Sequence, residues 1–423
     1  MKKILITLVL ILLCTTGYGV PMKKPRLMVH YMPWFIAKEG SGSWGYHWTM
    51  NYFNPDQLDD EGKRKIASHY YPLIGPYDSN DVDVLEYQVL LMKYSGIDGV
   101  IIDWYGTENF YDFAILHRNT RHLIEHLKKA RLQYAICYED WTIKEMVAKE
   151  HIAKSDDIKH AQGIMKWLDA NWFRDSGYLK FNNRPVLLVF GPQYFIKDEW
   201  KTIFSPLSIK PHFFPEDNIL PAATGSFPWP PMWASENGVL KPERLHEYLR
   251  ESYKKAKNYR YSIGAAFPCF HDFHNKKWTH DSFGYLDARD GVTYKETLET
   301  AIENESDIVQ IITWNDFGEG TIIEPTREFG YKYLKITQSI RKRKFDNFFE
   351  YTSKHLRIPH QLYLLRKKHK GNKTISRKLD QAAKLFFNNK VPEGYRILQL
   401  IKVNTIEAET KRKTQQKNSR DKK

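Results

Sequence analysis

Apolar and polar residues alternate along this chain in two distinct patterns. Short apolar runs, many of them rich in β-branched residues, are separated by longer stretches in which apolar residues return every three or four positions. The short runs predict buried strands, and the longer stretches predict amphipathic helices. Strands are expected at residues 27–31, 99–103, 132–138, 185–190, 261–267 and 308–313, with one or two weaker strands between residues 212 and 224. Helices are expected at residues 84–95, 119–130, 161–173, 242–258 and 293–303.

This alternation of strands and helices is typical of an α/β protein with a parallel sheet. Six clear strands with one or two weaker ones predict a (β/α)8 TIM barrel over residues 20–340, and a doubly wound sheet is the alternative. Residues 341–403 predict a basic, mostly helical extension, with short helices at 345–355, 360–370 and 375–387. Residues 404–423 are rich in Lys, Gln and Asn without an apolar period, so we expect a disordered basic tail there.

The net charge of +14 is unevenly distributed. Residues 341–423 carry 24 lysines and arginines against 7 acidic residues, a net charge of +17, whereas the preceding 340 residues have a net charge of −3. A nucleic-acid enzyme is expected to place basic residues around its cleft, and this barrel is nearly neutral. The charge therefore predicts no nucleic-acid partner for the barrel.

The first 19 residues have the features of an export signal. Lys2 and Lys3 are followed by an apolar segment from Ile4 to Leu13, which is too short to span a bilayer, and by the small-residue site Gly17-Tyr18-Gly19. The expected location is therefore periplasmic or secreted, and lipidation at Cys14 as a surface lipoprotein is the alternative. No later segment predicts a membrane span. Cleavage after Gly19 leaves two cysteines, Cys137 and Cys269, which give neither a disulfide framework nor a metal-binding pattern.

Residues whose side chains could take part in catalysis or binding follow the predicted strands at the points where those strands end. They are Trp34, Asp103-Trp104-Tyr105, Glu139-Asp140-Trp141, His271-Asp272 and the pair Asp316 and Glu319. In a TIM barrel the C-terminal ends of all strands share one face, so these side chains are expected to converge on one cleft.

The last of these segments, Thr313-Trp314-Asn315-Asp316-Phe317-Gly318-Glu319-Gly320-Thr321, carries the strongest signal. It places two carboxylates three residues apart in a loop directly after a buried strand. Hydrolysis of a glycosidic bond needs one group that protonates the leaving oxygen and a second that acts as base or nucleophile. A polar turn in which the aspartate caps a helix is the alternative.

Several motifs together resemble the glycoside hydrolase family 71/99-like group, over roughly residues 26–333. They are Tyr31-Met32-Pro33-Trp34, His47-Trp48, Gly75-Pro76-Tyr77-Asp78-Ser79, Gly96-Ile97-Asp98-Gly99, Asp103-Trp104-Tyr105-Gly106, Trp314-Asn315-Asp316-Phe317-Gly318-Glu319-Gly320 and Ile323-Glu324-Pro325. The group includes endo-α-mannosidases and endo-α-mannanases (family 99) and α-1,3-glucanases (family 71). The resemblance implies a (β/α)8 barrel, an α-linked glycan substrate and a carboxylate pair in the last loop.

The last loop departs from family 99, which has Asn-Glu-Trp-His-Glu where this chain has Asn315-Asp316-Phe317-Gly318-Glu319. Asp316 is one methylene shorter than the family glutamate, and the order of residues is closer to that of the α-1,3-glucanases. In α-mannosides the 2-hydroxyl is trans to the leaving group and a base can activate it, which is the mechanism that family 99 implies. In α-glucosides it is cis, and a base must activate water. We expect Glu319 to be the general acid and Asp316 the base.

A wider set of residues is expected to bind the sugar. The candidates are Tyr31, Trp34, Trp48, Asp78, Asp103, Trp104, Tyr105, Glu139, His271, Trp314, Asn315 and Glu324. Each has a structural alternative: the aromatic rings could be core, Asp78 and Asp103 could cap helices, and Glu139 could form a salt bridge. His271 and His274 flank Asp272, but no third ligand stands at a recognisable spacing, so neither a metal nor another cofactor is expected.

The sequence thus predicts an exported, endo-acting glycoside hydrolase for an α-linked glycan of the α-mannan or α-1,3-glucan type. A non-catalytic glycan-binding barrel is one alternative. An enzyme of polysaccharide biosynthesis is the other, because such proteins share a similar Trp-Asn-Glu-Trp-Ala-Glu-Gly loop.

Overall fold

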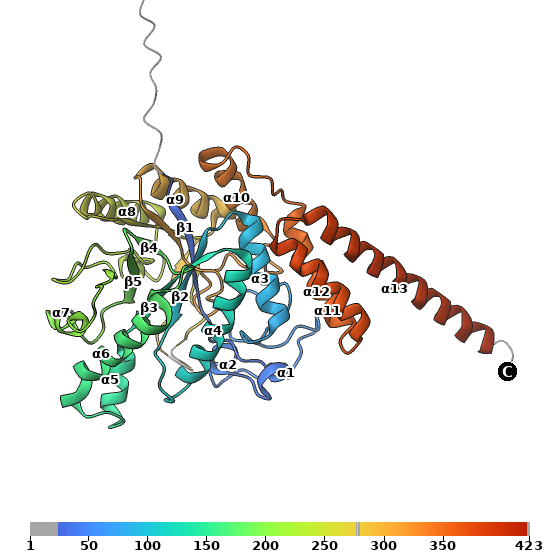
Figure 1. Cartoon of the computed structure of the whole chain (residues 1–423), viewed down its shortest axis with the longest axis horizontal. Helices are drawn as coiled ribbons and strands as arrows, with labels where there is room; N and C mark the ends of the chain where they lie inside the picture. The colour runs from blue at the N-terminus through green and yellow to red at the C-terminus, as the bar shows by residue number, and fades with distance from the viewer. Residues whose placement is uncertain (1–23, 276, 278–279, 421–423) are drawn as a thin grey trace, which may run out of the picture.

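A parallel β-sheet forms the centre of the molecule (Figure 1). The computed structural model describes residues 24–275, 277 and 280–420. Seven parallel strands follow one another in the order β7-β10-β1-β2-β3-β5-β6. They are β1 (Arg26–Tyr31), β2 (Gly99–Trp104), β3 (Gln133–Glu139), β5 (Arg184–Phe190), β6 (His212–Pro215), β7 (Ile263–Ala266) and β10 (Ile308–Ile311). Every residue of β2, β6, β7 and β10 is buried, as expected for strands covered on both faces.

An extended segment at residues 224–227 occupies the position between β6 and β7. Thr224 N donates to Phe213 O (2.8 Å) and Phe227 N donates to Pro215 O (3.1 Å), so the segment runs alongside β6. On its other side the backbone lies close to the residue before β7, since a Cβ on Gly225 would come within 2.7 Å of Tyr261 O. The sheet therefore curls into a (β/α)8 barrel. Of the one or two weaker strands predicted between residues 212 and 224, β6 is confirmed, whereas the segment at 224–227 begins only at the end of that range.

Helices surround the sheet, and all five predicted helices are confirmed (Figure 1). Most of their ends lie within a few residues of the predicted ones, and the helix predicted at 119–130 begins earlier, at Phe113. They are α3 (Val82–Ser95), α4 (Phe113–Ala130), α6 (Asp157–Leu168, continued by a π-helical turn to Phe173), α8 (Pro242–Ala256) and α9 (Val292–Glu303). The barrel also contains α1 (Lys38–Ser41), α2 (Tyr46–Thr49), α5 (Trp141–Ala148), α7 (Glu199–Phe204) and α10 (Lys332–Ile340). The remaining strands are short and antiparallel: β4 (Lys180–Phe181) pairs with β5, and β8 (Phe270–His271) with β9 (Tyr285–Leu286).

The C-terminal extension packs beside the barrel on α3 (Figure 1). Its helices are α11 (Ile358–Lys368), α12 (Lys373–Phe387) and α13 (Val391–Arg420). The helix predicted at residues 345–355 is absent, because a π-helical turn ends at Phe345 and the chain then runs irregularly to a short turn at His355–Arg357. Beyond Val403 the structure continues α13 as a helix to Arg420, where we predicted disorder. This stretch contains several good helix formers and no Pro or Gly, so nothing in its sequence ends the helix.

None of the described helices combines the length and the apolar character needed to cross a membrane. The predicted export signal and the alternative lipidation site at Cys14 lie outside the described residues.

Candidate functional site

A small pocket opens at the C-terminal ends of the parallel strands, and its volume is about 190 Å³. The strands β1, β2, β3 and β5 contribute His30, Asp103, Glu139 and Phe190. Loop and short-helix residues complete the lining: Met32, Trp34, Tyr46, His47, Met50, Tyr105, Trp229, His274, Asp316, Gly318 and Glu319. The ring of Trp34 stacks on that of His47, with the ring centroids 4.1 Å apart and an angle of 5° between the ring planes, which gives the pocket a flat aromatic wall.

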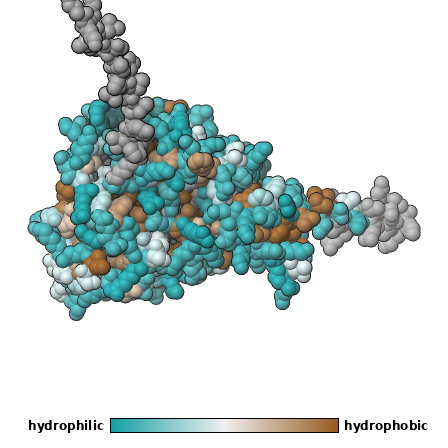
Figure 2. Space-filling model, turned by 45° about the horizontal axis from the view of Figure 1, so that its top comes forward, coloured by the Kyte–Doolittle hydropathy of each residue, from teal (hydrophilic) through white to brown (hydrophobic). Residues whose placement is uncertain are grey.

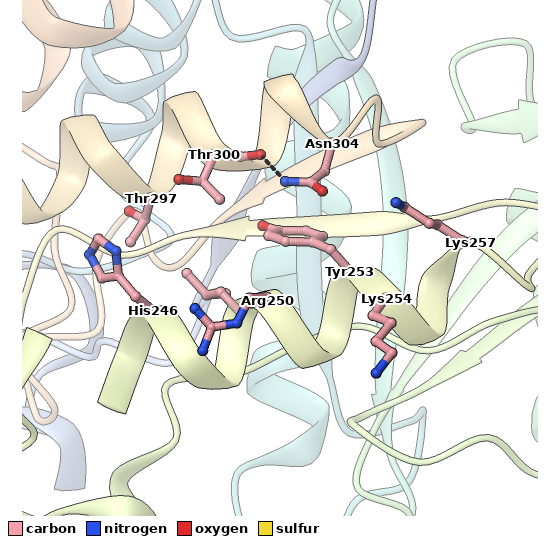
Figure 3. A pocket seen from close by; sticks show the side chains of 9 residues that line it. His246, Arg250, Tyr253, Lys254, Lys257, Thr297, Thr300 and Asn304 are labelled. Carbon is pink, nitrogen blue, oxygen red and sulfur yellow. Dashed lines mark hydrogen bonds between the residues drawn. The ribbon is translucent and has the colours of Figure 1, made fainter. Parts of the chain in front are cut away.

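A larger depression lies on the outside of the barrel, between α8 and α9 (Figure 3). Its volume is about 390 Å³, and its lining includes His246, Arg250, Lys254 and Lys257 but no carboxylate. The smaller pocket at the strand ends is therefore the better candidate for acid–base chemistry, because it alone of these two brings carboxylates together.

Four carboxylates line the pocket at the strand ends, and no lysine or arginine is among the lining residues in the described part of the chain. Burial raises the pKa of Asp316 to about 6, although a hydrogen bond from Glu319 N to Asp316 Oδ1 (2.9 Å) opposes the rise. Burial, followed by the negative charge of Asp316, raises the pKa of Glu319 well above its ordinary value. Glu319 Oε2 is buried and has no hydrogen-bond partner among the described residues. The surroundings of Glu319 thus favour its protonated form, whereas the hydrogen bond to Asp316 favours the ionised form of that residue, as a general acid and a base require.

Backbone and side-chain hydrogen bonds fix the acid loop, which we define as residues 313–321. Asp316 N donates to Thr313 Oγ1 (2.8 Å), which sets the turn just before the acids. Asn315 is fully buried and joins the loop to the end of β1: its Oδ1 accepts from Met32 N and its Nδ2 donates to Met32 O, both at 2.9 Å. The loop is therefore tied to the barrel at its first turn.

A buried polar chain supports Asn315 from behind. Its Nδ2 also contacts Tyr77 Oη (3.1 Å), and Tyr77 Oη in turn donates to Glu324 Oε2 (2.7 Å). Gln88 Nε2 donates to the other oxygen of Glu324 (3.0 Å), and Tyr31 Oη donates to Gln88 Oε1 (2.7 Å). These side chains lie behind the acid loop and outside the pocket lining, so they position the loop rather than contact a ligand in the pocket.

The second pair of acids, Asp103 and Glu139, comes from neighbouring strands. Burial, with a further contribution from the charge of Asp316, raises the pKa of Asp103 to about 8, and burial and Asp103 raise that of Glu139 well above its ordinary value. Burial also lowers the pKa of His30 and of His47 to about 3, so both imidazoles are neutral. Neutral imidazole and carboxyl groups offer both donors and acceptors to hydroxyl groups.

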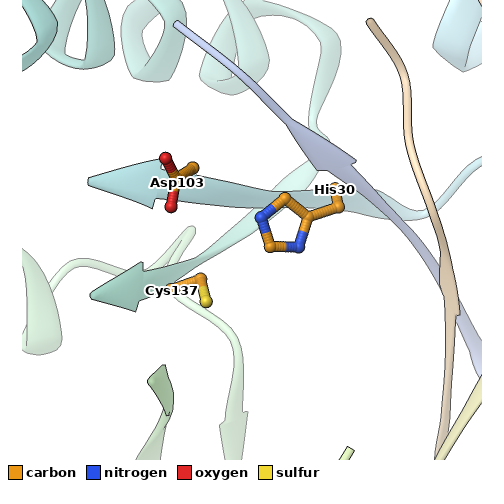
Figure 4. Close-up of side chains that lie close together, drawn as sticks. All are labelled: His30, Asp103 and Cys137. Carbon is orange, nitrogen blue, oxygen red and sulfur yellow. The ribbon is translucent and has the colours of Figure 1, made fainter. Parts of the chain in front are cut away.

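Asp103 also belongs to a cluster with His30 and Cys137, whose potential ligand atoms lie within 4.8 Å of one another (Figure 4). Among the described residues it is the one group of three with this geometry, and it could supply nitrogen, oxygen and sulfur donors to a metal ion. Neither carboxylate oxygen of Asp103 has a hydrogen-bond partner in the described part of the chain. Since His30 and Asp103 both face the pocket, the same free atoms are equally suited to bind sugar hydroxyls.

Comparisons with known proteins agree with this architecture. The family model described as Glycosyltransferase WbsX matches residues 60–212. No curated protein has significant similarity to the chain. The GH99 endo-α-mannosidase from Bacteroides thetaiotaomicron is similar in structure, with 16% identity, a TM-score of 0.53, and coverage of 74% of this chain and 96% of that one. The same enzyme in complex with Bis-Tris propane gives 17% identity, a TM-score of 0.54, and coverage of 74% and 95%.

This chain has the family 99 fold. A structure described as a glycoside hydrolase-like protein is a further neighbour, with 13% identity, a TM-score of 0.53, and coverage of 76% of this chain and 96% of that chain. At these identities the comparison establishes the shared barrel, and the roles of individual residues depend on the geometry of this chain.

Within the family 99 fold, six residues predicted for the site line the pocket: Trp34, Asp103, Tyr105, Glu139, Asp316 and Glu319. The other eight do not: Tyr31, Trp48, Asp78, Trp104, His271, Trp314, Asn315 and Glu324. Tyr31, Asn315 and Glu324 instead belong to the chain of hydrogen bonds behind the acid loop.

The remaining five have structural contacts. Trp48 donates to Tyr77 O (2.8 Å), and the carboxylate of Asp78 accepts from Ala37 N, Ser41 Oγ and Asn80 N. Trp104 contacts His117, and the His271 ring stacks on His69. Trp314 is fully buried. These eight side chains thus lie outside the pocket lining, because the sequence marks which residues follow a strand but not which way each side chain turns. Their predicted role in binding a substrate stays a prediction.

Sequence reasoning missed His30, Tyr46, His47, Trp229 and His274 as lining residues. His30 carried a weak signal, since it is a polar residue in an otherwise apolar strand, and such residues often face a site at a barrel's strand ends. Trp229 lies on a loop and Tyr46 on the short helix α2, and the position of both depends on the whole fold.

Proposed function

We propose that this protein is an endo-acting glycoside hydrolase that cleaves an α-linked glycan of the α-mannan or α-1,3-glucan type. The observation that carries the proposal is the pair of acids in the acid loop, which face one pocket. Burial raises the pKa of both, and the charge of Asp316 raises that of Glu319 further. The family 99 fold and the activity of its endo-α-mannosidase neighbours support the same class of reaction.

In the proposed mechanism Glu319 is the general acid and protonates the leaving glycosidic oxygen. Asp316, ionised above about pH 6, is the base. In an α-mannoside it takes the proton of the 2-hydroxyl, which is trans to the leaving group, and the 2-oxygen displaces that group from behind to form a 1,2-anhydro sugar. Water, deprotonated by the Glu319 carboxylate, then opens this ring at the anomeric carbon while Asp316 returns the proton to the 2-oxygen, so the configuration is retained. In an α-glucoside the 2-hydroxyl is cis, so Asp316 takes the proton of a water molecule, and the configuration is inverted. No metal or cofactor takes part.

The family model that matches residues 60–212 is named for glycosyl transfer, which would use an activated sugar donor. A nucleotide-sugar donor carries a diphosphate, and proteins usually hold such a group with cationic side chains, a metal ion or a helix N-terminus. The described residues that line the pocket include no lysine or arginine, which favours hydrolysis over transfer from such a donor.

The test is the release of reducing ends by the purified protein from α-mannan and from α-1,3-glucan, assayed in parallel. Release from either substrate, abolished in Glu319→Gln, is the expected result. The conservative change keeps the size of the side chain and removes the proton that the mechanism needs. Saturable binding of a glycan without any release would instead identify a non-catalytic glycan-binding barrel.

We further propose that the protein is exported, on the basis of the basic, apolar and small-residue segments in its first 19 residues. Fractionation of cells that express the full chain, with mass spectrometry of its N-terminus, tests this. A cytosolic protein with these residues intact would refute export.

A further inference from the structure

We propose that a second pocket, built around Trp233 beside the acid-loop pocket, binds a distal sugar unit of the same glycan chain. This inference rests on the proposed function, because it takes the ligand to be the glycan that is cleaved. The second pocket has a volume of about 450 Å³, within the range of roughly 300–1,000 Å³ that is usual for small-molecule sites.

Trp233 is the feature of this pocket that most needs an explanation. Its side chain is 75% exposed and lies in the pocket wall, on the short turn Met232–Ala234. A ligand that covers such a ring removes its apolar surface from water, which favours binding. One face of a sugar ring presents only C–H bonds, which pack well on the negative face of an indole.

Polar side chains line the same pocket as this indole. Asp217, Asn218, Arg244 and Ser252 line the same pocket and offer both donors and acceptors. The Tyr248 ring stands at 81° to that of Trp233, with centroids 6.2 Å apart, and therefore forms a second wall. An aromatic wall with convergent polar groups is typical of a specific small-molecule site.

The backbone links this second pocket directly to the acid-loop pocket. Trp229 lines the acid-loop pocket, and the residues from Pro230 to Met232 carry the chain from there to Trp233. Tyr248 joins the two: its hydroxyl accepts from Trp229 N (3.2 Å) and donates to Asp217. A glycan chain whose scissile bond lies at Glu319 would thus meet Trp233 within a few sugar units.

The opposite face of α8 provides an internal contrast. The face toward the second pocket carries Arg244, Tyr248 and Ser252, whereas the other face lines the groove of Figure 3 with His246, Arg250 and Lys254. Among the described residues, that groove has no exposed Trp, Tyr or Phe ring in its wall, because Tyr253 is buried. Of the two faces of α8, the one that carries Arg244, Tyr248 and Ser252 thus combines an exposed indole with surrounding polar side chains.

The test measures binding and turnover separately, with Trp233→Ala and with Phe348→Ala as a matched control. Phe348 is 95% exposed and lines none of the pockets described here, so its removal deletes an exposed ring elsewhere. In the inactive Glu319→Gln background, calorimetry with α-manno- and α-1,3-gluco-oligosaccharides of increasing length should show affinity that rises with length. Trp233→Ala should remove this gain, about tenfold, and Phe348→Ala should leave it unchanged.

In the active protein, Trp233→Ala should lower kcat/KM for the polymer by about tenfold and leave that for a short aryl glycoside unchanged. Affinity for long oligosaccharides that stays within about twofold of the parent, or no binding of any oligosaccharide, would overturn the inference. Failure of this inference and failure of the proposed hydrolase function give different results, because calorimetry measures binding at Trp233 and the reducing-end assay measures hydrolysis. Length-dependent binding without release of reducing ends keeps the second pocket and refutes the hydrolase.

Discussion

At the scale of single residues, the two acids of the acid loop differ in what surrounds their carboxylates. Asp316 Oδ1 accepts the Glu319 N–H, and such a bond favours the ionised form. Glu319 Oε2 receives no hydrogen bond from the described residues and faces the charge of Asp316, so its proton is retained. The three-residue spacing alone could not predict this division of roles, because it depends on which carboxylate accepts from the backbone.

The division of roles predicts a bell-shaped dependence of kcat/KM on pH. Below about pH 6 Asp316 becomes protonated and loses its function as base, so kcat/KM should fall about tenfold per pH unit. The descending limb at high pH belongs to Glu319 and should vanish in Glu319→Gln, assayed with a substrate whose leaving group needs no protonation. A flat profile between about pH 4 and pH 6 would show that Asp316 is not the base.

A second prediction at this scale concerns Asp103 and stability. The unfolded chain releases this proton near the ordinary pKa of 3.8, whereas the folded protein holds it to about pH 8. The folded state therefore binds more protons, and stability is lost as pH rises through this window. Asp103→Asn should increase the free energy of unfolding at pH 8 by an amount on the order of a few kcal/mol, which raises the melting temperature. Near pH 4 the variant should change the melting temperature little. Asp60→Asn, at an exposed position, is the control. An equal shift at both pH values would contradict this account.

At the scale of elements, the acid loop depends on groups that never reach the pocket. Glu324, 1% exposed, accepts from Tyr77 and Gln88, and Tyr77 contacts Asn315. Burial raises the pKa of Glu324 to about 8, so a neutral amide can replace it without changing the charge at pH 7.

This chain of contacts predicts that Glu324→Ala lowers kcat by about tenfold or more, while KM changes by less than about twofold. The variant leaves Tyr77 without its acceptor and lets Asn315 shift the acids relative to the scissile bond. Glu324→Gln keeps an acceptor at the same place and should restore most of the activity. If both variants lost activity to the same extent, or if KM rose instead of kcat falling, Glu324 would not act by positioning the loop.

The elements themselves were largely predictable from the sequence. The strands were evident because both of their faces are buried, which leaves short apolar runs such as residues 99–103 and 308–313. The sequence signal for the eighth strand position of the barrel was weaker, because residues 224–227 contain Gly225 and pair with β6 only in part. The pocket was predictable at its carboxylates, which follow strands directly, and not at Trp229 or His47, whose approach depends on loops that only the folded chain brings together.

At the scale of the whole molecule, the basic extension is held to a nearly neutral barrel by a small number of ion pairs. Arg366 on α11 makes a bidentate contact with Glu86 on α3 (2.7 and 2.9 Å) and reaches Asp380 on α12 (2.8 Å). Beyond this attachment α13 projects from the body, and apolar side chains remain at the surface of the extension (Figures 1 and 2). Among them Leu400 and Val403 are 65% and 50% exposed.

Arg366 should therefore contribute far more to the free energy of unfolding than the other basic residues of the extension do. Glu86 is 8% exposed, and burial raises its pKa even though Arg366 opposes the rise. Without Arg366 the ionised carboxylate would lie buried and unpaired, which costs roughly 3 kcal/mol in comparable cases. Because a protonated Glu86 needs no partner, the loss of melting temperature in Arg366→Ala should be large at pH 7 and small near pH 4. Arg343→Ala removes an exposed pair with Glu299 and should change the melting temperature little at either pH. Equal effects of the two variants would mean that the extension is held by its apolar contacts with α3 and not by this ion pair.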